Sequence, residues 1–78
     1  MTQIDKLLAK FFQNPESISY SDLTKILIVY GFGEIQAKWS HVKWKHELLS
    51  KDLVIPIHNN DCKPTYKRLA KKSIQELP

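Results

Sequence analysis

The sequence predicts an α+β fold in which helices pack on one face of a three-stranded antiparallel sheet. Apolar residues recur at helical spacing in three segments, and in the middle of the chain their period changes to the alternation of strands. The resulting order is helix, helix, strand, strand, strand, helix. We therefore expect an αβββα core preceded by an extra N-terminal helix.

The first predicted helix runs from residue 3 to residue 13, with Thr2 and Asp5 placed to form a capping box at its start. Asn14-Pro15 ends it, because proline cannot continue a helix. The second helix begins after the cap residue Ser19 and ends near Tyr30. Gly31 behind it can adopt the left-handed conformation that closes many helices.

From Glu34 the period becomes two, with Ile35 and Ala37 on one side of a first strand. A polar segment at residues 49–52 makes a hairpin into a third strand over residues 53–58, whose odd-numbered apolar positions should face the helices. Pro56 lacks an N–H, which favours an edge or a bulge for this strand.

The second strand, residues 40–47, alternates cationic and apolar side chains. Successive side chains of a strand point to opposite sides of the sheet. One predicted face therefore carries an imidazole and two ammonium groups, and the other is apolar: His41, Lys43 and Lys45 form the first, and Val42 and Trp44 form the second.

Pro64 suits the first turn of the last helix. The apolar face of this helix should be buried and consists of Tyr66, Leu69, Ala70, Ile74 and Leu77. The opposite face is basic and consists of Lys67, Arg68, Lys71 and Lys72, with Lys63 before it. A solvated helix face, an RNA contact and a docking site for an acidic protein all remain open for this basic stripe.

Composition limits the function classes. The 78 residues include 12 Lys+Arg and 8 Asp+Glu, for a net charge of +4, which favours a polyanion or an acidic protein partner. The single cysteine, Cys62, excludes an internal disulfide and fits a reducing cytoplasm. The start lacks a signal-peptide pattern, and no apolar run approaches the ~20 residues that span a bilayer, so we expect neither secretion nor membrane insertion.

Three motifs in this order resemble the HicA family of toxin mRNA endonucleases. They are Gly31-Phe32 after a helix, Ser40-His41-Val42-Lys43-Trp44-Lys45-His46 on the second strand, and Pro56-Ile57-His58 closing the third. The resemblance covers about residues 18–77 and includes the Asn59-Asn60 and Lys63-Pro64 run.

The resemblance implies a double-stranded-RNA-binding-domain-like fold and a single domain over residues 1–78, with residues 1–17 as an extra helix and linker and residues 18–78 as the core. It also implies the toxin component of a type II toxin–antitoxin system, a metal-independent mRNA endonuclease neutralised by a HicB-like antitoxin. The family's catalytic histidine maps onto His41.

Trp39 departs from the family pattern, which has glycine before Ser-His. Glycine there could serve a turn with positive φ or a close approach of RNA to the backbone. Either the turn is built differently, or the activity is altered or lost. The indole could stack on a base or pack against the partner, while its parity with Ile35 and Ala37 makes a core position at least as well supported.

RNA can be cut by its own 2′-hydroxyl if one group removes the 2′ proton and another protonates the leaving oxygen. Histidine can do either near neutral pH, which makes His41 the catalytic candidate. Lys38, Lys43 and Lys45 are candidates for binding phosphate. Ser40 is expected to support His41 from the adjacent position.

His58 is a possible second acid or base, because strand parity puts it on the same open face as His41. Its alternative is a strand-end residue bonded to the Asn59-Asn60 turn. His46 should be structural, at the edge of the core face. A zinc set of the histidines and Cys62 is opposed by parity, so no metal is expected.

Three functions are compared. The leading one is the RNA endonuclease. The alternative is a non-catalytic RNA-binding module of the same fold, in which Trp39 marks a degenerate site. A scaffold whose basic face meets an acidic partner leaves the open-face histidines unexplained.

Overall fold

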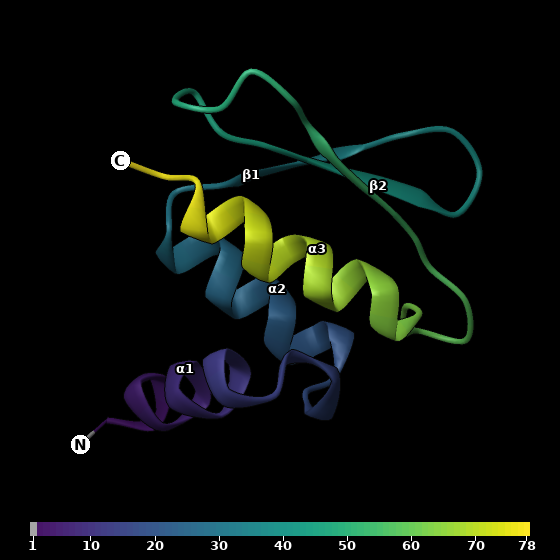
Figure 1. The fold of residues 1–78 in the computed structure, drawn as a ribbon. Coiled ribbons are helices and arrows are strands. Elements are labelled where there is room, and N and C mark those ends of the chain that lie inside the picture. The colour runs from purple at the N-terminus through teal and green to yellow at the C-terminus, as the bar shows by residue number, and fades with distance from the viewer. Residues whose placement is uncertain (1) are drawn as a thin grey trace.

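The computed structural model describes residues 2–78 and contains a three-stranded antiparallel sheet with three α-helices. In Figure 1 the sheet forms one layer, α2 (Tyr20–Val29) and α3 (Pro64–Gln75) lie against one of its faces, and α1 (Gln3–Gln13) lies beyond these two helices. The predicted α+β class and the order of its elements are confirmed. No helix among residues 2–78 covers the other face of the sheet.

The helix starts follow the predicted caps. Thr2 accepts a hydrogen bond from the Asp5 N–H and donates its own N–H to the Asp5 carboxylate, which completes the capping box of α1. Proline ends α1 and begins a short 3-10 helix, η1 (Pro15–Ser17). Ser19 then caps α2 by accepting from the Asp22 N–H. Both ends of α1 and the start of α2 therefore have a local chemical cause.

The end of α2 is a Schellman motif that turns the chain into the sheet. The N–H of Gly31 donates to Ile28, and the N–H of Phe32 donates to Leu27, both at 3.0 Å. Gly31 has φ +92, and a Cβ atom there would lie 3.2 Å from Nε2 of His46. The backbone conformation therefore favours glycine at this position, and the His46 ring would have to shift to admit a Cβ atom.

The strands form a meander in the order β1-β2-β3, each antiparallel to its neighbour. They are shorter than predicted: β1 is Gly33–Gln36, β2 is His41–Lys45 and β3 is Leu53–Pro56. Pro56 lies on an edge strand, as expected for a residue without an N–H. The central strand is the one that carries the predicted catalytic residue.

The predicted core position of the Ile35 and Ala37 side of β1 is wrong. Ile35 pairs with Lys43, and directly paired residues share a face, so Ile35 lies on the open face and is 45% exposed. The cause is the register of the β1–β2 hairpin, in which Ile35 pairs with Lys43 and Gln36 with Val42, so that odd-numbered residues pair with odd-numbered ones. Trp39 is not in the core either, and its side chain is 89% exposed.

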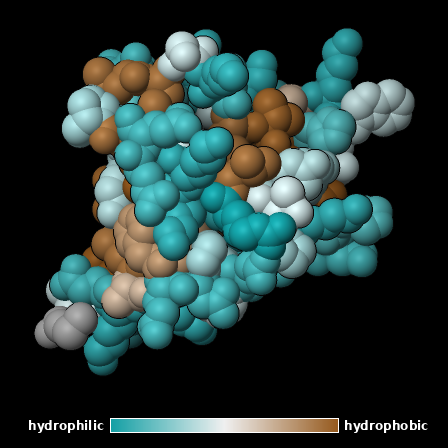
Figure 2. Space-filling model, viewed as in Figure 1, coloured by the Kyte–Doolittle hydropathy of each residue, from teal (hydrophilic) through white to brown (hydrophobic). Residues whose placement is uncertain are grey.

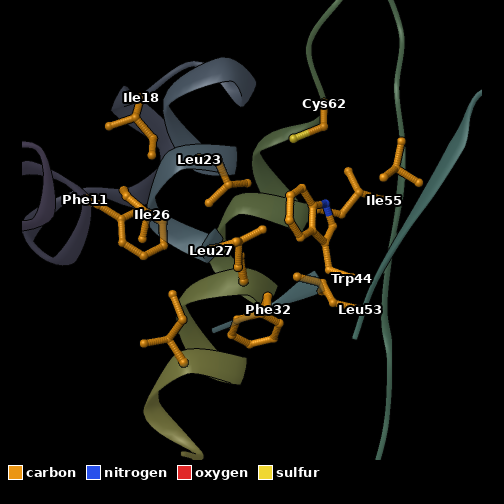
Figure 3. Packing of buried hydrophobic residues seen from close by; sticks show 13 residues of the cluster. Phe11, Ile18, Leu23, Ile26, Leu27, Phe32, Trp44, Leu53, Ile55 and Cys62 are labelled. Carbon is orange, nitrogen blue, oxygen red and sulfur yellow. The ribbon is translucent and has the colours of Figure 1, made fainter. Parts of the chain in front are cut away.

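The core lies between the sheet and the helices (Figure 3). Trp44 from the central strand is fully buried, and its Nε1 donates to the Tyr20 hydroxyl at 3.2 Å. Phe11 extends the same cluster to α1, so the N-terminal helix covers part of the core. The predicted burial of Leu69 on α3 is wrong, since that side chain is 41% exposed.

An ion pair between a buried lysine of α3 and a half-exposed aspartate connects α3 with the start of α2. Lys67 is only 5% exposed, and its ammonium lies 3.2 Å from Oδ1 of Asp61. The same oxygen accepts from the backbone N–H of Tyr20 at 3.1 Å and of Cys62 at 2.7 Å. Lys67 is therefore not part of a solvated basic stripe, and Asp61 ties the start of α2 to the segment before α3.

This arrangement alters the acidity of Asp61. Burial by itself would raise the pKa of the carboxyl group, but hydrogen bonds from Cys62, Lys67 and Tyr20 and the charge of Lys67 outweigh it, so the pKa lies below its ordinary value of 3.8. A lowered folded-state pKa stabilises the protein at pH values above the ordinary one. That stabilisation is lost as the pH falls through the folded-state value.

Replacing Asp61 with Asn should reduce the free energy of unfolding by about 1–2 kcal/mol at neutral pH, because it leaves the Lys67 ammonium buried without a counter-charge. The loss is smaller than for a fully buried pair, since the Asp61 side chain is about half exposed. Urea unfolding from neutral to acidic pH would measure it, and the two proteins should converge at low pH. Asp52→Asn, at a looser surface pair, is the control. A difference that persists at low pH would contradict the electrostatic cause.

Candidate functional site

The open face of β2 carries the predicted catalytic group. Burial alternates along the strand, with His41 and Lys45 exposed and Lys43 half-buried, while Val42 and Trp44 between them are buried. The predicted division of this strand into two faces is confirmed. It follows from the apolar side chains, whose burial against the helices leaves the imidazole and both ammonium groups on the other side.

The neighbouring strands complete this open face. Lys43 lies between Ile35 of β1 and Val54 of β3, and these two apolar side chains are 45% and 43% exposed. His41 lies opposite Pro56 of β3. Lys43, at the centre of this face, is thus flanked by an apolar side chain on each side, and sequence reasoning missed this neighbourhood because it did not give the register.

The backbone of His41 is fixed while its ring is accessible. Its N–H donates to the Lys38 carbonyl and its carbonyl accepts from the Ala37 N–H, both at 3.2 Å. Within residues 2–78 the imidazole has no hydrogen-bond partner. An exposed histidine without an internal partner is available to exchange a proton with a bound substrate.

The three predicted phosphate-binding lysines are spread along the sheet. Adjacent residues of a strand rise about 3.3 Å, so Lys43 lies about 7 Å and Lys45 about 13 Å along β2 from His41. Lys38 is exposed in the turn that precedes His41. Lys38 and Lys43 can therefore approach one phosphate near His41, whereas Lys45 is placed for a neighbouring phosphate.

Lys43 also has an acidic neighbour that sequence reasoning missed. Its Nζ lies 3.9 Å from a carboxylate oxygen of Asp52, and both side chains are partly exposed. A long, solvated pair of this kind contributes little and is readily exchanged for another anion. Asp52 comes close to Lys43 because Trp44 pairs with Leu53, the residue after Asp52. This register is set by the packing of the folded protein and cannot be read from the sequence of β2.

Trp39 occupies a strained position in the tip of the β1–β2 hairpin. The Lys38–His41 turn has Trp39 at its second position with φ +64, and Ser40 after it does not have positive φ. These signs match a type II′ turn, in which glycine is favoured at this position. Trp39 thus has the backbone conformation that glycine would adopt without strain, and its ring points into solvent.

His58 lies just beyond the end of β3. Its N–H donates to the Asp61 carbonyl at 2.7 Å across a turn in which Asn59 and Asn60 have φ +53 and +63. The predicted bonding of His58 to this turn is confirmed for the backbone. Its side chain is exposed and helps to line a cavity of about 300 Å³ together with Ser40, Pro56, Ile57, Lys63 and Tyr66.

This cavity brings His58 next to the residue that precedes His41, although His41 itself is not in its lining. Tyr66 at its rim is a site candidate that sequence reasoning did not identify, and Lys63 was noted only as the basic residue before the last helix. The only sequence signal for them was their proximity to the start of the last helix. A second, more open cavity of about 440 Å³ on the helix side of β1 also includes Ser40 in its lining.

His46 is structural, as predicted. Its Nδ1 accepts from the Leu48 N–H at 3.1 Å, so the neutral ring carries its proton on Nε2 and donates to the Tyr30 carbonyl at 2.9 Å. The ring also packs edge-on against Phe32, with centroids 4.9 Å apart. His46 therefore joins the end of β2 to the end of α2.

Most of the predicted basic stripe on α3 is engaged inside the molecule. Arg68 pairs with Glu16 of η1, and the Lys71 ammonium donates to the Phe12 carbonyl at 2.7 Å. Lys67 is buried, whereas Arg68, although paired, and Lys72 remain exposed. The stripe mainly attaches α3 to the N-terminal elements.

Within residues 2–78 no group of three or more histidine, cysteine, aspartate or glutamate side chains is positioned to hold a metal ion. In the same range, no helix is both long and apolar enough to cross a membrane.

Replacing Trp39 with Gly should raise the free energy of unfolding by about 0.5–1 kcal/mol. A non-glycine residue at positive φ costs about 1–2 kcal/mol, and the greater freedom of glycine in the unfolded chain offsets about 0.5–1 kcal/mol of the gain. Urea or thermal unfolding would measure the difference. Ser40→Gly, next to it without positive φ, should be destabilising. A less stable Trp39→Gly protein would show that the indole makes contacts that outweigh the strain.

No family model, no curated protein and no solved structure matches this chain.

Proposed function

We propose that this protein is a HicA-like RNA endonuclease, the toxin component of a type II toxin–antitoxin system, acting on mRNA in the cytoplasm with a double-stranded-RNA-binding-domain-like core. The observation that carries the proposal is the exposed imidazole of His41 on the open face of the central strand, with Lys43 on the same face. The Ser-His motif of the resembling family lies at this position.

The proposed reaction needs only groups of the RNA and of the protein. His41 takes the proton of a ribose 2′-hydroxyl, whose oxygen attacks the adjacent phosphorus. A bond forms between the 2′-oxygen and phosphorus, and the bond from phosphorus to the 5′-oxygen breaks. A proton delivered to that oxygen, for which His58 is the candidate donor, leaves a 2′,3′-cyclic phosphate and a 5′-hydroxyl.

The lysines have separate roles in this proposal. Lys38 and Lys43 offset the negative charge that grows on the reacting phosphate, an effect strongest for donors held in place before reaction. Lys45, about 13 Å from His41 along the strand, holds a neighbouring phosphate. Ser40 supports His41 through the turn that both share.

The proposed protein partner is a HicB-like antitoxin with an acidic contact surface. An acidic segment laid across the open face would pair with the lysines of β2 and cover His41 at the same time. Lys43 already has a carboxylate neighbour in Asp52, at 3.9 Å, so a partner's carboxylate would find a site suited to it.

A second candidate, an RNA-binding module without catalysis, is favoured by one observation. Trp39 has positive φ at the position where the resembling family has glycine, and an indole there restricts how closely RNA can approach the backbone. Such a module would bind RNA with the same lysines and leave it intact.

Replacing His41 with Ala should lower the rate of RNA cleavage by at least about 100-fold, the usual contribution of a general acid or base. The purified protein and its variant would be assayed on labelled RNA in the presence of a chelator, with analysis of the product ends. The variant should unfold like the parent, because the ring is exposed and has no partner within residues 2–78.

His58→Ala tests the proposed proton donor, an exposed histidine outside β2. A smaller loss than for His41→Ala is expected if water can replace it as the proton donor. Undiminished cleavage by His41→Ala would remove that residue from the mechanism. A parent protein that binds RNA and never cleaves it would establish the second candidate instead.

A further inference from the structure

We propose that the Trp39 ring stacks on one unpaired nucleobase of single-stranded RNA. This base lies next to the phosphate at which His41 acts and which the lysines of β2 bind. The inference rests on the RNA binding of the proposed function and not on cleavage. It assigns the ring a role that the glycine of the resembling family cannot perform.

The backbone of Trp39 is the first observation. Within residues 2–78, four residues have positive φ: Gly31, Asn59, Asn60 and Trp39. Glycine and asparagine are the residues that tolerate this conformation best, and the chain uses them at the other three positions. At the tip of the β1–β2 hairpin the chain has tryptophan, the bulkiest residue, instead. The positive φ of Trp39 costs stability, and because its ring is exposed, packing does not offset this cost.

The surroundings of the ring are the second observation. Trp39 is 89% exposed, more than any other large apolar side chain among the described residues. Its sequence neighbours Lys38, Ser40 and His41 are polar or cationic. Figure 2 shows mainly hydrophilic and weakly polar residues around the hairpin tip, at the right, whereas strongly hydrophobic residues gather elsewhere in this view.

The isolation of the Trp39 ring from other apolar side chains favours a nucleobase over a protein as its binding partner. A protein interface needs a contiguous patch of about 800 Å² on each partner, with an apolar centre, and a single indole among cations does not provide one. A nucleobase needs only one aromatic face and a nearby cation for its phosphate. Bases in a duplex are already stacked, so the base must be unpaired.

Trp39, Lys38 and His41 lie close enough together to contact the base and the phosphate of a single nucleotide. Trp39 is two residues from His41, and the Lys38 carbonyl accepts from the His41 N–H at 3.2 Å, which holds the hairpin tip against the start of β2. A base on the indole therefore places its own phosphate near Lys38 and His41. Stacking is tolerant of sequence, because every base has a π-face, so this contact positions the RNA without strict base selection.

The test is binding of a short single-stranded RNA with 2′-O-methyl riboses, which cannot be cleaved through the 2′-oxygen. Trp39→Asn removes the ring and suits the backbone, as Asn59 and Asn60 show at φ +53 and +63. Its affinity should fall about 5- to 150-fold at fixed salt. Trp39→Phe should retain most of the affinity, and Leu48→Asn, which removes an exposed apolar residue outside this hairpin, should retain all of it.

Fluorescence gives a second readout that a merely structural role would not change. Trp44 is fully buried, so quenching by the RNA should come from Trp39 and disappear in Trp39→Asn. An RNA of the same length with abasic sites should bind parent and Trp39→Asn equally, and a duplex should not quench.

Affinity of Trp39→Asn within twofold of the parent, or equal losses on intact and abasic RNA, would overturn the stacking proposal and leave a protein contact as the role of the ring. If the stacking results hold and the parent does not cut unmodified RNA, only the nuclease proposal fails. If the parent cuts RNA and Trp39→Asn binds it as tightly, only the stacking proposal fails.

Discussion

The burial of Trp44 at the centre of the middle strand is the constraint on which the other features depend. Its ring fills the space between the sheet and the helices, and its Nε1 donates to Tyr20 at the start of α2. Because side chains alternate along a strand, this one burial sends His41, Lys43 and Lys45 to the opposite face. A slip of one residue would put three polar side chains into the core, so the accessibility of the candidate site follows from packing.

The sequence predicted those parts of the fold that have local causes. The capping box of α1, the break at Pro15 and the glycine after α2 each depend on residues within one turn of each other, and all three are present. The placement of Ile35 was wrong because it depends on the register of a hairpin. A register shifted by one residue would have buried the side chain that the observed register exposes.

The candidate site could be predicted only along β2. The faces of that strand follow from its own sequence, but the neighbours of Lys43 come from two other strands and require the register. The basic stripe of α3 failed for a related reason: helical spacing shows which cations lie together, and not that Asp61, Glu16 and Phe12 engage three of them. Charge counted along a sequence therefore overstated the charge that this helix offers to a partner.

The meander order of the sheet has a consequence for how the protein folds. Each strand pairs with its neighbour in the chain, so both pairings close short loops at small entropic cost. The contact from Asp61 to the Tyr20 N–H joins residues 41 positions apart and must wait until α2 meets the segment before α3. We therefore expect hairpins that form and dissolve rapidly, with the docking of the helices as the slow step that commits the chain to its native state.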